Sequence, residues 1–140
     1  MKESILGTDI FSYITDNRYP EVLARGRQYI RAFGHYSVSA VTVTEVLLGY
    51  RSKMDDERAA DFFKRLETCE VFPVDPEEAI LGGEILARLM RAGQDVGPFD
   101  PFIAATAIES ERVLVTNNIK HYQRVVNLGF PLEPENWRDS

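Results

Sequence analysis

Short apolar runs alternate with longer segments of helical periodicity along the whole chain, and this alternation limits the fold to very few classes. Four runs predict buried strands, at residues 4–6, 37–40, 70–74 and 112–116. Strands of this kind are buried in a parallel sheet that helices cover on both faces. The sequence therefore predicts an α/β protein with three layers, α/β/α, around a mainly parallel sheet of four or five strands. The fifth strand is expected near Leu132.

The segments between the strands carry apolar residues three or four positions apart, as amphipathic helices do. A short helix is expected through Phe11 and Tyr13. Asp75-Pro76 is a good helix start, because Asp caps helices and Pro suits the first turn. Gly82-Gly83 indicates close packing or a bend rather than a phosphate loop, since no strand directly precedes it. Of the five longer helices, four are expected to begin near Pro20, at Thr42, after Asp75-Pro76 and at Pro98, and one carries the apolar face Ala59, Phe62, Phe63 and Leu66.

Length and charge restrict the function classes. A chain of 140 residues suits one compact domain, spanning residues 1–140. The net charge of −6 argues against a protein that simply coats nucleic acid, but allows an enzyme that reaches phosphate through a bound cation. The single cysteine, Cys69, predicts a half-buried thiol in a reducing compartment. No segment approaches the roughly 18 apolar residues of a membrane span, so a cytoplasmic protein is expected.

Polar residues follow the predicted strands at the ends where α/β sheets form their sites. Asp9 follows the first strand, Glu45 follows the second, Asp100 opens a helix, and Asn117-Asn118 follow the strand at 112–116. Oxygen ligands without Cys or His partners indicate a hard ion such as Mg²⁺ or Mn²⁺. An acidic Mg²⁺ site on an α/β scaffold predicts phosphodiester or phosphoryl chemistry.

Each of these residues also has a purely local explanation. Asp9 could cap the short helix, and Thr42-Val43-Thr44-Glu45 fits a capping box in which Glu45 reaches back to the Thr42 amide. The helix dipole favours Asp100 near a helix start, and Asn117-Asn118 could be turn residues. The four together still favour one site, because separate helix starts need not place acids at a single end of the sheet.

Four segments resemble, in order and spacing, the motifs of PIN-domain nucleases of the VapC branch of toxin–antitoxin ribonucleases. Residues 5–14 are similar to the opening motif, a hydrophobic strand followed by an Asp-Thr-Asn/Asp sequence and a helix. Residues 37–49 resemble the second motif, with its Glu after a Ser/Thr-rich strand end. Residues 97–107, the most specific, resemble the third motif and residues 114–122 the fourth. Asn136-Trp137 matches the common ending.

The resemblance implies a PIN-like α/β/α fold and an Mg²⁺-dependent endoribonuclease (Mn²⁺ as the alternative ion) that acts on structured RNA such as tRNA or rRNA. It also implies a VapB-type antitoxin in the active-site groove, and homodimers. Carried over by motif, Glu45, Asp100 and Asn118 would be the catalytic residues, with Glu45 and Asp100 as metal ligands. Asn118 would ligate the metal or hold its water, Thr116 would support that water, and Asp9 would orient the first-motif loop.

One departure from the motifs bears directly on activity. The family's first acidic metal ligand falls on Gly7, which has no side chain to bind a cation. The sequence thus predicts an inactive or impaired form, whether Gly7 is an introduced change or a natural one. The alternative is a catalytically dead PIN module that binds antitoxin or RNA without cleaving it. A phosphatase of the aspartyl-phosphate kind fits poorly, since of its two acids after the first strand only Asp9 remains.

Binding RNA requires basic side chains near the acids, because a negative groove repels phosphate. Several basic residues are candidates for this role, although a solvated helix face explains the same charges. They are Arg25, Arg27, Arg31, Arg51, Lys53, Lys120 and His121.

Overall fold

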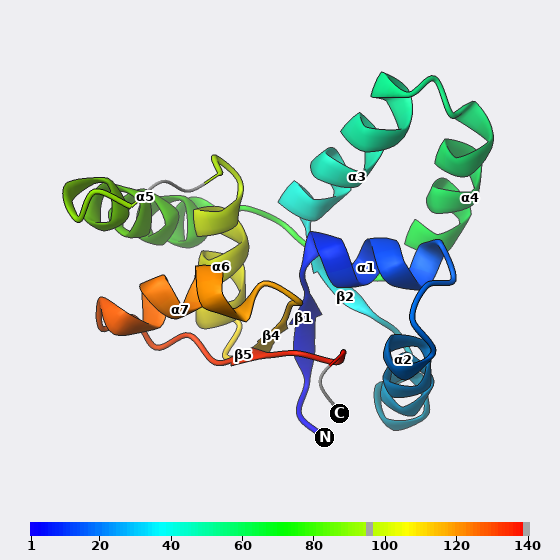
Figure 1. Cartoon of the computed structure of the whole chain (residues 1–140), viewed down its shortest axis with the longest axis horizontal. Coiled ribbons are helices and arrows are strands. Elements are labelled where there is room, and N and C mark those ends of the chain that lie inside the picture. Colours follow the sequence, from blue (N-terminus) through cyan, green and yellow to red (C-terminus); the bar gives the residue numbers. More distant parts are fainter. Residues whose placement is uncertain (95–96, 139–140) are drawn as a thin grey trace.

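The computed structural model describes residues 1–94 and 97–138, and in these it contains one five-stranded sheet with helices on both faces (Figure 1). The strands are β1 (Ser4–Leu6), β2 (Ser37–Ser39), β3 (Glu70–Phe72), β4 (Val113–Val115) and β5 (Pro134–Glu135). The helices are α1 (Thr8–Thr15), α2 (Pro20–Phe33), α3 (Ala40–Ser52), α4 (Asp56–Leu66), α5 (Pro76–Arg91), α6 (Asp100–Glu109) and α7 (Ile119–Asn127). The sheet order is β3-β2-β1-β4-β5, and every pair of neighbours is parallel.

The three-layer prediction is confirmed by the way side chains alternate across the sheet. Leu6 and Val115 join a core cluster formed with α1, α2, α3 and α4. Their neighbours Ile5 and Leu114 point to the opposite face and join a cluster formed with α5, α6 and α7. The three central strands, β1, β2 and β4, are therefore buried along their whole length, which explains why they are continuous apolar or small runs rather than alternating ones. The edge strand β3 is largely exposed, and the edge strand β5 is half-buried.

Two helix starts differ from the prediction. The first is α3, which begins at Ala40 instead of Thr42, because the Ser39 hydroxyl accepts a hydrogen bond from the Val41 amide at 3.1 Å and caps the helix. The predicted capping box between Thr42 and Glu45 is therefore wrong. The second is α6, which begins at Asp100, two residues after Pro98. Helix α7 was not predicted from the sequence at all.

The prediction for Cys69 is confirmed. Cys69 is a free, half-buried thiol that donates to the Arg65 carbonyl oxygen at 3.3 Å, and burial raises its pKa. Among the described residues, no helix has both the length and the apolar character that a membrane span requires.

The adjacent glycines of α5 have opposite surroundings, which gives a stability prediction. A Cβ at Gly82 would lie 2.5 Å from Phe102 Cδ1, whereas a Cβ at Gly83 would meet nothing within 4 Å. Gly82→Ala should lower the free energy of unfolding by about 1–3 kcal/mol through overpacking between α5 and α6. Gly83→Ala should raise it by about 1 kcal/mol through helix propensity. Urea unfolding measures both, and equal effects of the two substitutions would contradict the packing account.

Candidate active site at the carboxyl ends of the central strands

The acidic residues meet where the order of strands reverses. From β1 the chain proceeds to β2 and β3 on one side, and later returns to β4 and β5 on the other. In open α/β sheets the crevice at such a switch point is where ligands bind. A hollow of about 280 Å³ lies there, beyond the carboxyl ends of β1 and β4. Its walls are formed by Thr8, Asp9, Glu45, Asp100, Ile103, Thr116, Asn118 and Tyr122.

Asp9 ties the loop after β1 to the loop after β4. Its Oδ1 accepts the Ile10 amide at 2.8 Å, and its Oδ2 accepts the Asn117 amide at 2.8 Å and the Thr116 hydroxyl at 3.3 Å. Burial raises the pKa of this carboxyl, while the hydrogen bonds from Asn117, Ile10 and Thr116 oppose the rise. Asp9 lies in the first turn of α1 but does not cap it, since Gly7 occupies the N-cap position.

Glu45 projects into the hollow from the second turn of α3. The Thr8 hydroxyl donates to Glu45 Oε1 at 2.7 Å, and Thr8 Oγ1 also lies 3.1 Å from the Thr42 hydroxyl. Burial raises the pKa of Glu45, and the charges of Asp100 and Asp9 raise it further, against the opposing effect of the Thr8 hydrogen bond. The three carboxylates therefore repel one another across the hollow.

Asp100 stands opposite Glu45 at the start of α6, and two side chains of α7 hold it. His121 Nε2 lies 2.8 Å from Asp100 Oδ2, and the Tyr122 hydroxyl donates to Asp100 Oδ1 at 3.2 Å. Burial is the largest cause that raises the pKa of Tyr122 well above its ordinary value, and the Asp100 charge adds to it. This keeps the phenol protonated as a donor.

Position 7 lies at the edge of the same cluster. A Cβ built on Gly7 would lie 3.0 Å from Asp9 Oδ1, 3.0 Å from the Val115 carbonyl oxygen and 3.6 Å from Thr116 Cβ. A side chain at this position would therefore start beside Asp9 and Thr116, two residues that line the hollow. The backbone at Gly7 is extended (φ −65°, ψ 161°), which any residue can adopt.

The oxygen atoms that line the hollow are of the kind that binds a hard divalent cation, but few of them are acidic and available. All of them are carboxylate, amide or hydroxyl oxygens, the ligands that Mg²⁺ prefers. Nevertheless, the described part of the chain holds no group of three His, Cys, Asp or Glu side chains arranged to bind a metal. Asp9 is committed to backbone and hydroxyl donors, which leaves Glu45 and Asp100 as the acids available to a cation.

Most of the predicted site residues line the hollow, and most of the predicted basic residues do not. Asp9, Glu45, Asp100, Thr116 and Asn118 line one hollow, as the positions at the strand ends predicted. Of the basic candidates, His121 reaches this site through Asp100. The others, which do not line the hollow, are Arg25, Arg27, Arg31, Arg51, Lys53 and Lys120. Arg25 is instead paired with Glu135 at 2.7 Å.

The roles of two residues in the site were not predicted from the sequence. Thr8 orients Glu45, and Tyr122 orients Asp100. Thr8 lies between Gly7 and Asp9 in the first motif, so its position was a usable signal. Tyr122 could be found only by recognising α7, on which it follows Asn118 by one helical turn.

Repulsion among the carboxylates predicts that the site costs stability when no cation is bound. At pH 7, Glu45→Gln should raise the melting temperature by about 2 °C, since the Thr8 hydrogen bond can persist and solvent screening keeps the gain below about 1 kcal/mol. Because the pKa of Glu45 is raised, the difference should grow as pH rises through that pKa and vanish below the unfolded value. Glu84→Gln, an exposed change on α5, is the control for differential scanning fluorimetry across pH. A lower melting temperature for Glu45→Gln would contradict the repulsion.

Comparison with known proteins identifies the family to which this geometry belongs. Residues 5–127 match the family described as PIN domain. Ribonuclease VapC2 of Haemophilus influenzae is 33% identical over 141 residues, which cover 98% of this chain and 99% of the relative. The tRNA(fMet)-specific endonuclease VapC of Salmonella typhimurium is 36% identical over 92 residues, 63% of this chain and 67% of the relative.

Solved structures show the same fold over nearly the full length. VapBC2 from Rickettsia felis, bound to a DNA fragment from their promoter, matches with a TM-score of 0.81 and 25% identity over 96% of this chain and 98% of that chain. DNA-bound VapBC from Salmonella typhimurium matches with a TM-score of 0.80 and 27% identity over 98% and 99%. The chain therefore belongs to the PIN-domain family and, within it, groups with the VapC proteins.

Proposed function

We propose that this protein is an Mg²⁺-dependent endoribonuclease toxin of a VapBC-type toxin–antitoxin module, and that Gly7 leaves the present form inactive or impaired. The observation that carries the proposal is the meeting of Glu45, Asp100 and Asn118 in one hollow at the switch point of the sheet. Relatives named as VapC ribonucleases support the substrate class. Mn²⁺ has the same ligand preference and could replace Mg²⁺.

In this proposal the chain acts by positioning groups around the scissile phosphate. A bound divalent cation would supply an activated water for in-line attack and would neutralise charge on the leaving oxygen. Glu45 and Asp100 would hold the cation, with the Asn118 side chain as a further oxygen donor. Thr8 fixes the Glu45 carboxylate, while His121 and Tyr122 fix that of Asp100.

Asp9 has a different role from these ligands. Through its bonds to the Asn117 amide and the Thr116 hydroxyl it holds the loop after β4 against the loop after β1. The Thr116 hydroxyl in turn accepts the Asn118 amide at 2.9 Å. Asp9 and Thr116 thus set the position of Asn118 and would act as positioning residues.

Two partners follow from the same proposal. A VapB-type antitoxin would neutralise the toxin, in keeping with the VapBC complexes among the similar structures. The RNA substrate would be structured RNA such as tRNA, in keeping with the relative named as a tRNA(fMet)-specific endonuclease. We also propose that the chain forms homodimers, which the molar mass of the purified protein in solution will test.

The second candidate is a PIN module that binds antitoxin or RNA without cleaving it. Gly7 favours this function for the chain as it stands, because it leaves two acids free to hold a cation. Cleavage assays on purified tRNA and rRNA, with Mg²⁺ or with EDTA, distinguish the two. Cleavage by the Gly7→Asp form that stops in EDTA supports the nuclease, and absence of cleavage by that form contradicts it.

A further inference from the structure

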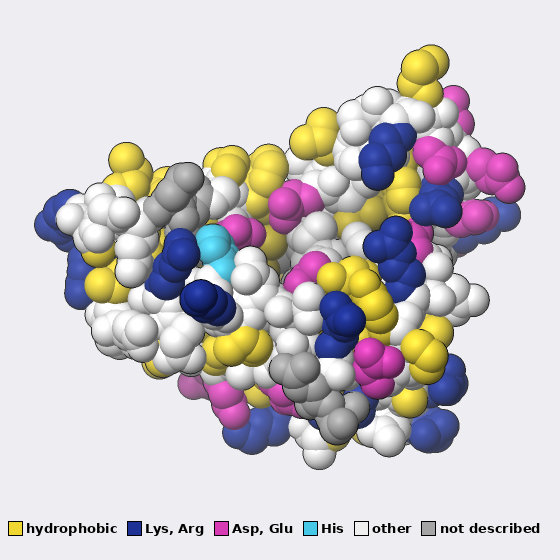
Figure 2. Space-filling view, viewed as in Figure 1, with side chains coloured by type: hydrophobic (Ala, Val, Ile, Leu, Met, Phe, Trp, Pro, Cys, Tyr) yellow, Lys and Arg dark blue, Asp and Glu magenta, His cyan; other side chains and the backbone are white. Residues whose placement is uncertain are grey.

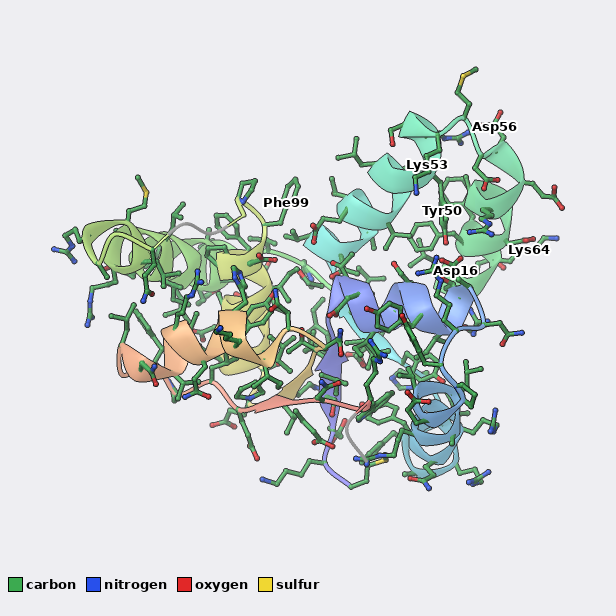
Figure 3. The ribbon with its side chains drawn as sticks, in the orientation of Figure 1. Asp16, Tyr50, Lys53, Asp56, Lys64 and Phe99 are labelled. Carbon is green, nitrogen blue, oxygen red and sulfur yellow. The ribbon has the colours of Figure 1, made fainter. Side chains whose placement is uncertain are left out.

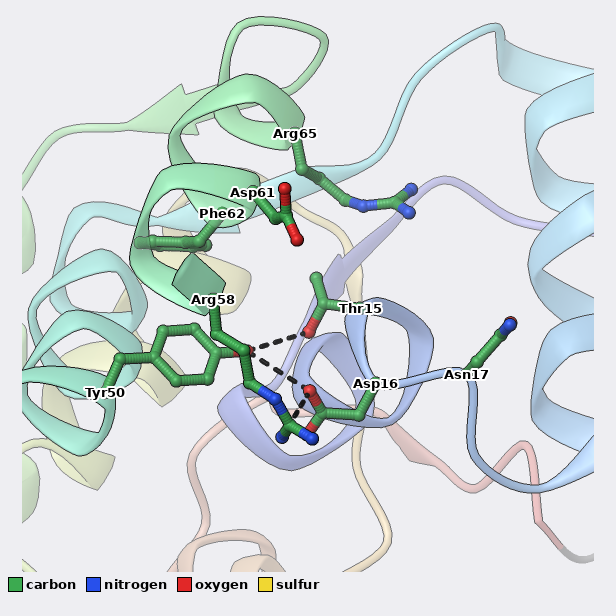
Figure 4. Close-up of a pocket in the computed structure, with 8 residues that line it drawn as sticks. All are labelled: Thr15, Asp16, Asn17, Tyr50, Arg58, Asp61, Phe62 and Arg65. Carbon is green, nitrogen blue, oxygen red and sulfur yellow. Dashed lines mark hydrogen bonds and ion pairs between the residues drawn. The ribbon is translucent and has the colours of Figure 1, made fainter. Parts of the chain in front are cut away.

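The acidic hollow continues into a groove between α1 and the hairpin formed by α3 and α4. A second hollow of about 240 Å³ shares Thr8 and Glu45 with the acidic hollow. A third, of about 230 Å³, shares Asp16, Tyr50 and Arg58 with the second (Figure 4). We call the second and third hollows together the hairpin groove. It leads directly away from the proposed site of cleavage.

One face of α3 forms a wall of the hairpin groove and changes character along its length. Glu45, Gly49 and Lys53 are spaced four residues apart, so they lie on the same side of the helix. Lys53 is about 12 Å along the helix axis from Glu45. A Cβ at Gly49 would meet nothing within 4 Å, so the wall is flat and open at this point. An extended chain could therefore pass from Glu45 to Lys53 against the helix backbone.

The basic residues of the hairpin groove divide into those engaged within the protein and those free for a ligand. Arg58 is engaged: its guanidinium lies 3.3 Å from Asp16 (Figure 4) and 3.4 Å from Asp55, so its single positive charge is shared between two acids. In contrast, no acidic side chain in the described part of the chain lies within ion-pair distance of Arg18, Lys53 or Arg65. Arg18 and Lys53 are exposed and line the second hollow, whereas Arg65 is half-buried and lines the third.

The surface around the hairpin groove carries both basic and acidic side chains. Dark-blue side chains lie over α1 and the hairpin on this face, and magenta ones lie both among them and toward the middle of the face (Figure 2). Lys53 lies on the side of the hairpin that also carries Tyr50, whereas Lys64 lies on the outer side of α4 (Figure 3). Lys64 lines neither part of the groove.

We propose that the hairpin groove holds the single-stranded RNA segment next to the scissile phosphate, with Lys53 and Arg18 binding backbone phosphates and Gly49 giving the strand room. This proposal rests on the proposed nuclease function for the substrate class. RNA fits better than an acidic peptide, because its regularly spaced phosphates could bind a cation at the acidic end and the unpaired basic side chains farther along. The contacts are to phosphates, so they would position the strand without reading its sequence.

The test measures RNA binding by the chain as it stands, so it does not depend on cleavage. A fluorescein-labelled single-stranded RNA of about ten nucleotides is titrated between about 50 and 200 mM salt, and anisotropy is recorded. Lys53→Gln and Arg18→Gln should each weaken binding several-fold and lower the slope of log K against log salt by about 0.7. Gly49→Leu should weaken binding at every salt concentration without changing that slope.

Matched controls separate these effects from unfolding and from general charge. Lys64→Gln removes the same charge on the outer side of α4, and Gly83→Leu makes the same change at another exposed, uncrowded helix glycine. Both should bind RNA as the unaltered chain does. Gly49→Leu should melt at or above the temperature of the unaltered chain, because leucine favours the helix more than glycine does.

The outcomes keep this proposal distinct from the nuclease proposal. If the unaltered chain does not bind RNA, or if the groove variants and the controls bind RNA equally well, the hairpin groove does not hold the RNA strand. If the substitutions in the groove instead weaken the binding of a VapB-type antitoxin and leave RNA binding unchanged, the groove holds that protein and the proposal that it holds RNA is wrong. If the Gly7→Asp form does not cleave RNA but the groove variants still bind RNA more weakly than the unaltered chain, the nuclease proposal is wrong and the proposal for the groove stands.

Discussion

Replacing Gly7 with aspartate is expected to raise the rate of Mg²⁺-dependent RNA cleavage by about 100-fold or more, which corresponds to roughly 3 kcal/mol of transition-state stabilisation. The reason is geometric. A Cβ at position 7 starts 3.0 Å from Asp9 Oδ1 and 3.6 Å from Thr116 Cβ, so an added carboxylate would lie beside two residues that line the hollow and add a third acid to Glu45 and Asp100. Cleavage of tRNA at fixed protein concentration, quantified on denaturing gels, measures the rate.

Replacing Gly7 with aspartate should also lower the stability of the fold, and Gly7→Asn is the control for this effect. The new Cβ would lie 3.0 Å from the Val115 carbonyl oxygen, so β4 must shift by a few tenths of an ångström. Gly7→Asn introduces the same crowding without the charge. In EDTA both variants should melt below the unaltered chain, and Gly7→Asp should melt lowest because its carboxylate faces Asp9. Mg²⁺ should restore stability to Gly7→Asp alone, and equal cleavage by all three forms would refute the role of position 7.

Asp100→Asn in the Gly7→Asp background is expected to lower cleavage by about 100-fold or more, back toward the rate of the unaltered chain. An amide keeps an acceptor for the Tyr122 hydroxyl but removes the charge that would hold the cation. The fold should survive, because one of four mutually repelling acids is lost. Calorimetric titration with Mg²⁺ should show weaker binding in parallel with slower cleavage.

Glu109→Gln is the matched control for Asp100→Asn. It removes one acid from the last turn of the same helix, at an exposed position outside the hollow. Cleavage and Mg²⁺ affinity should both stay unchanged. If Asp100→Asn cleaves as fast as Glu109→Gln, Asp100 does not hold the cation and the assignment of α6 to the active site fails.

The layers of the fold could be predicted because its three central strands are buried. Val113–Val115 and Ser4–Leu6 are continuous apolar or small segments, and such runs have few alternatives to the interior of a parallel sheet. The positions of Asp9 and Glu45 followed from the same reasoning, because the loops after parallel strands share one edge of the sheet. Among the described residues Asp100 follows helix α5 rather than a strand, and its place at that edge was expected because it lies at the start of a helix. The gathering of Asp9, Glu45 and Asp100 was therefore predictable before any coordinates.

Helix α7 escaped prediction for a physical reason. It has nine residues, and of these Tyr122 and Val125 are buried, too few to establish a helical period. The pair Asn117-Asn118, directly before the helix, is also typical of a turn. The helix is stabilised instead by tertiary contacts, with Tyr122 and Val125 packed in the core against α5 and α6. The partners of Asp100 on α7, His121 and Tyr122, were hidden with it.

The start of α3 shows how a local motif can mislead. Thr42-Val43-Thr44-Glu45 satisfies the capping-box pattern, yet Ser39 caps the helix and Thr42 is buried beside Thr8. The consequence is that Glu45 lies one turn further into the helix, where its side chain can reach the hollow. The basic residues were uncertain in another way, since sequence alone could not show that Lys53 faces the groove while Arg51 pairs with Asp56.

The central claim is that oxygen side chains from distant stretches of the chain share one divalent cation. Crystals of the Gly7→Asp form soaked in Mn²⁺, with anomalous diffraction recorded, test it most directly. The account predicts a peak at about 2.1 Å from carboxylate oxygens of both Glu45 and Asp100, the distance typical of a small hard cation. A peak elsewhere, or none at a Mn²⁺ concentration that supports cleavage, would contradict it.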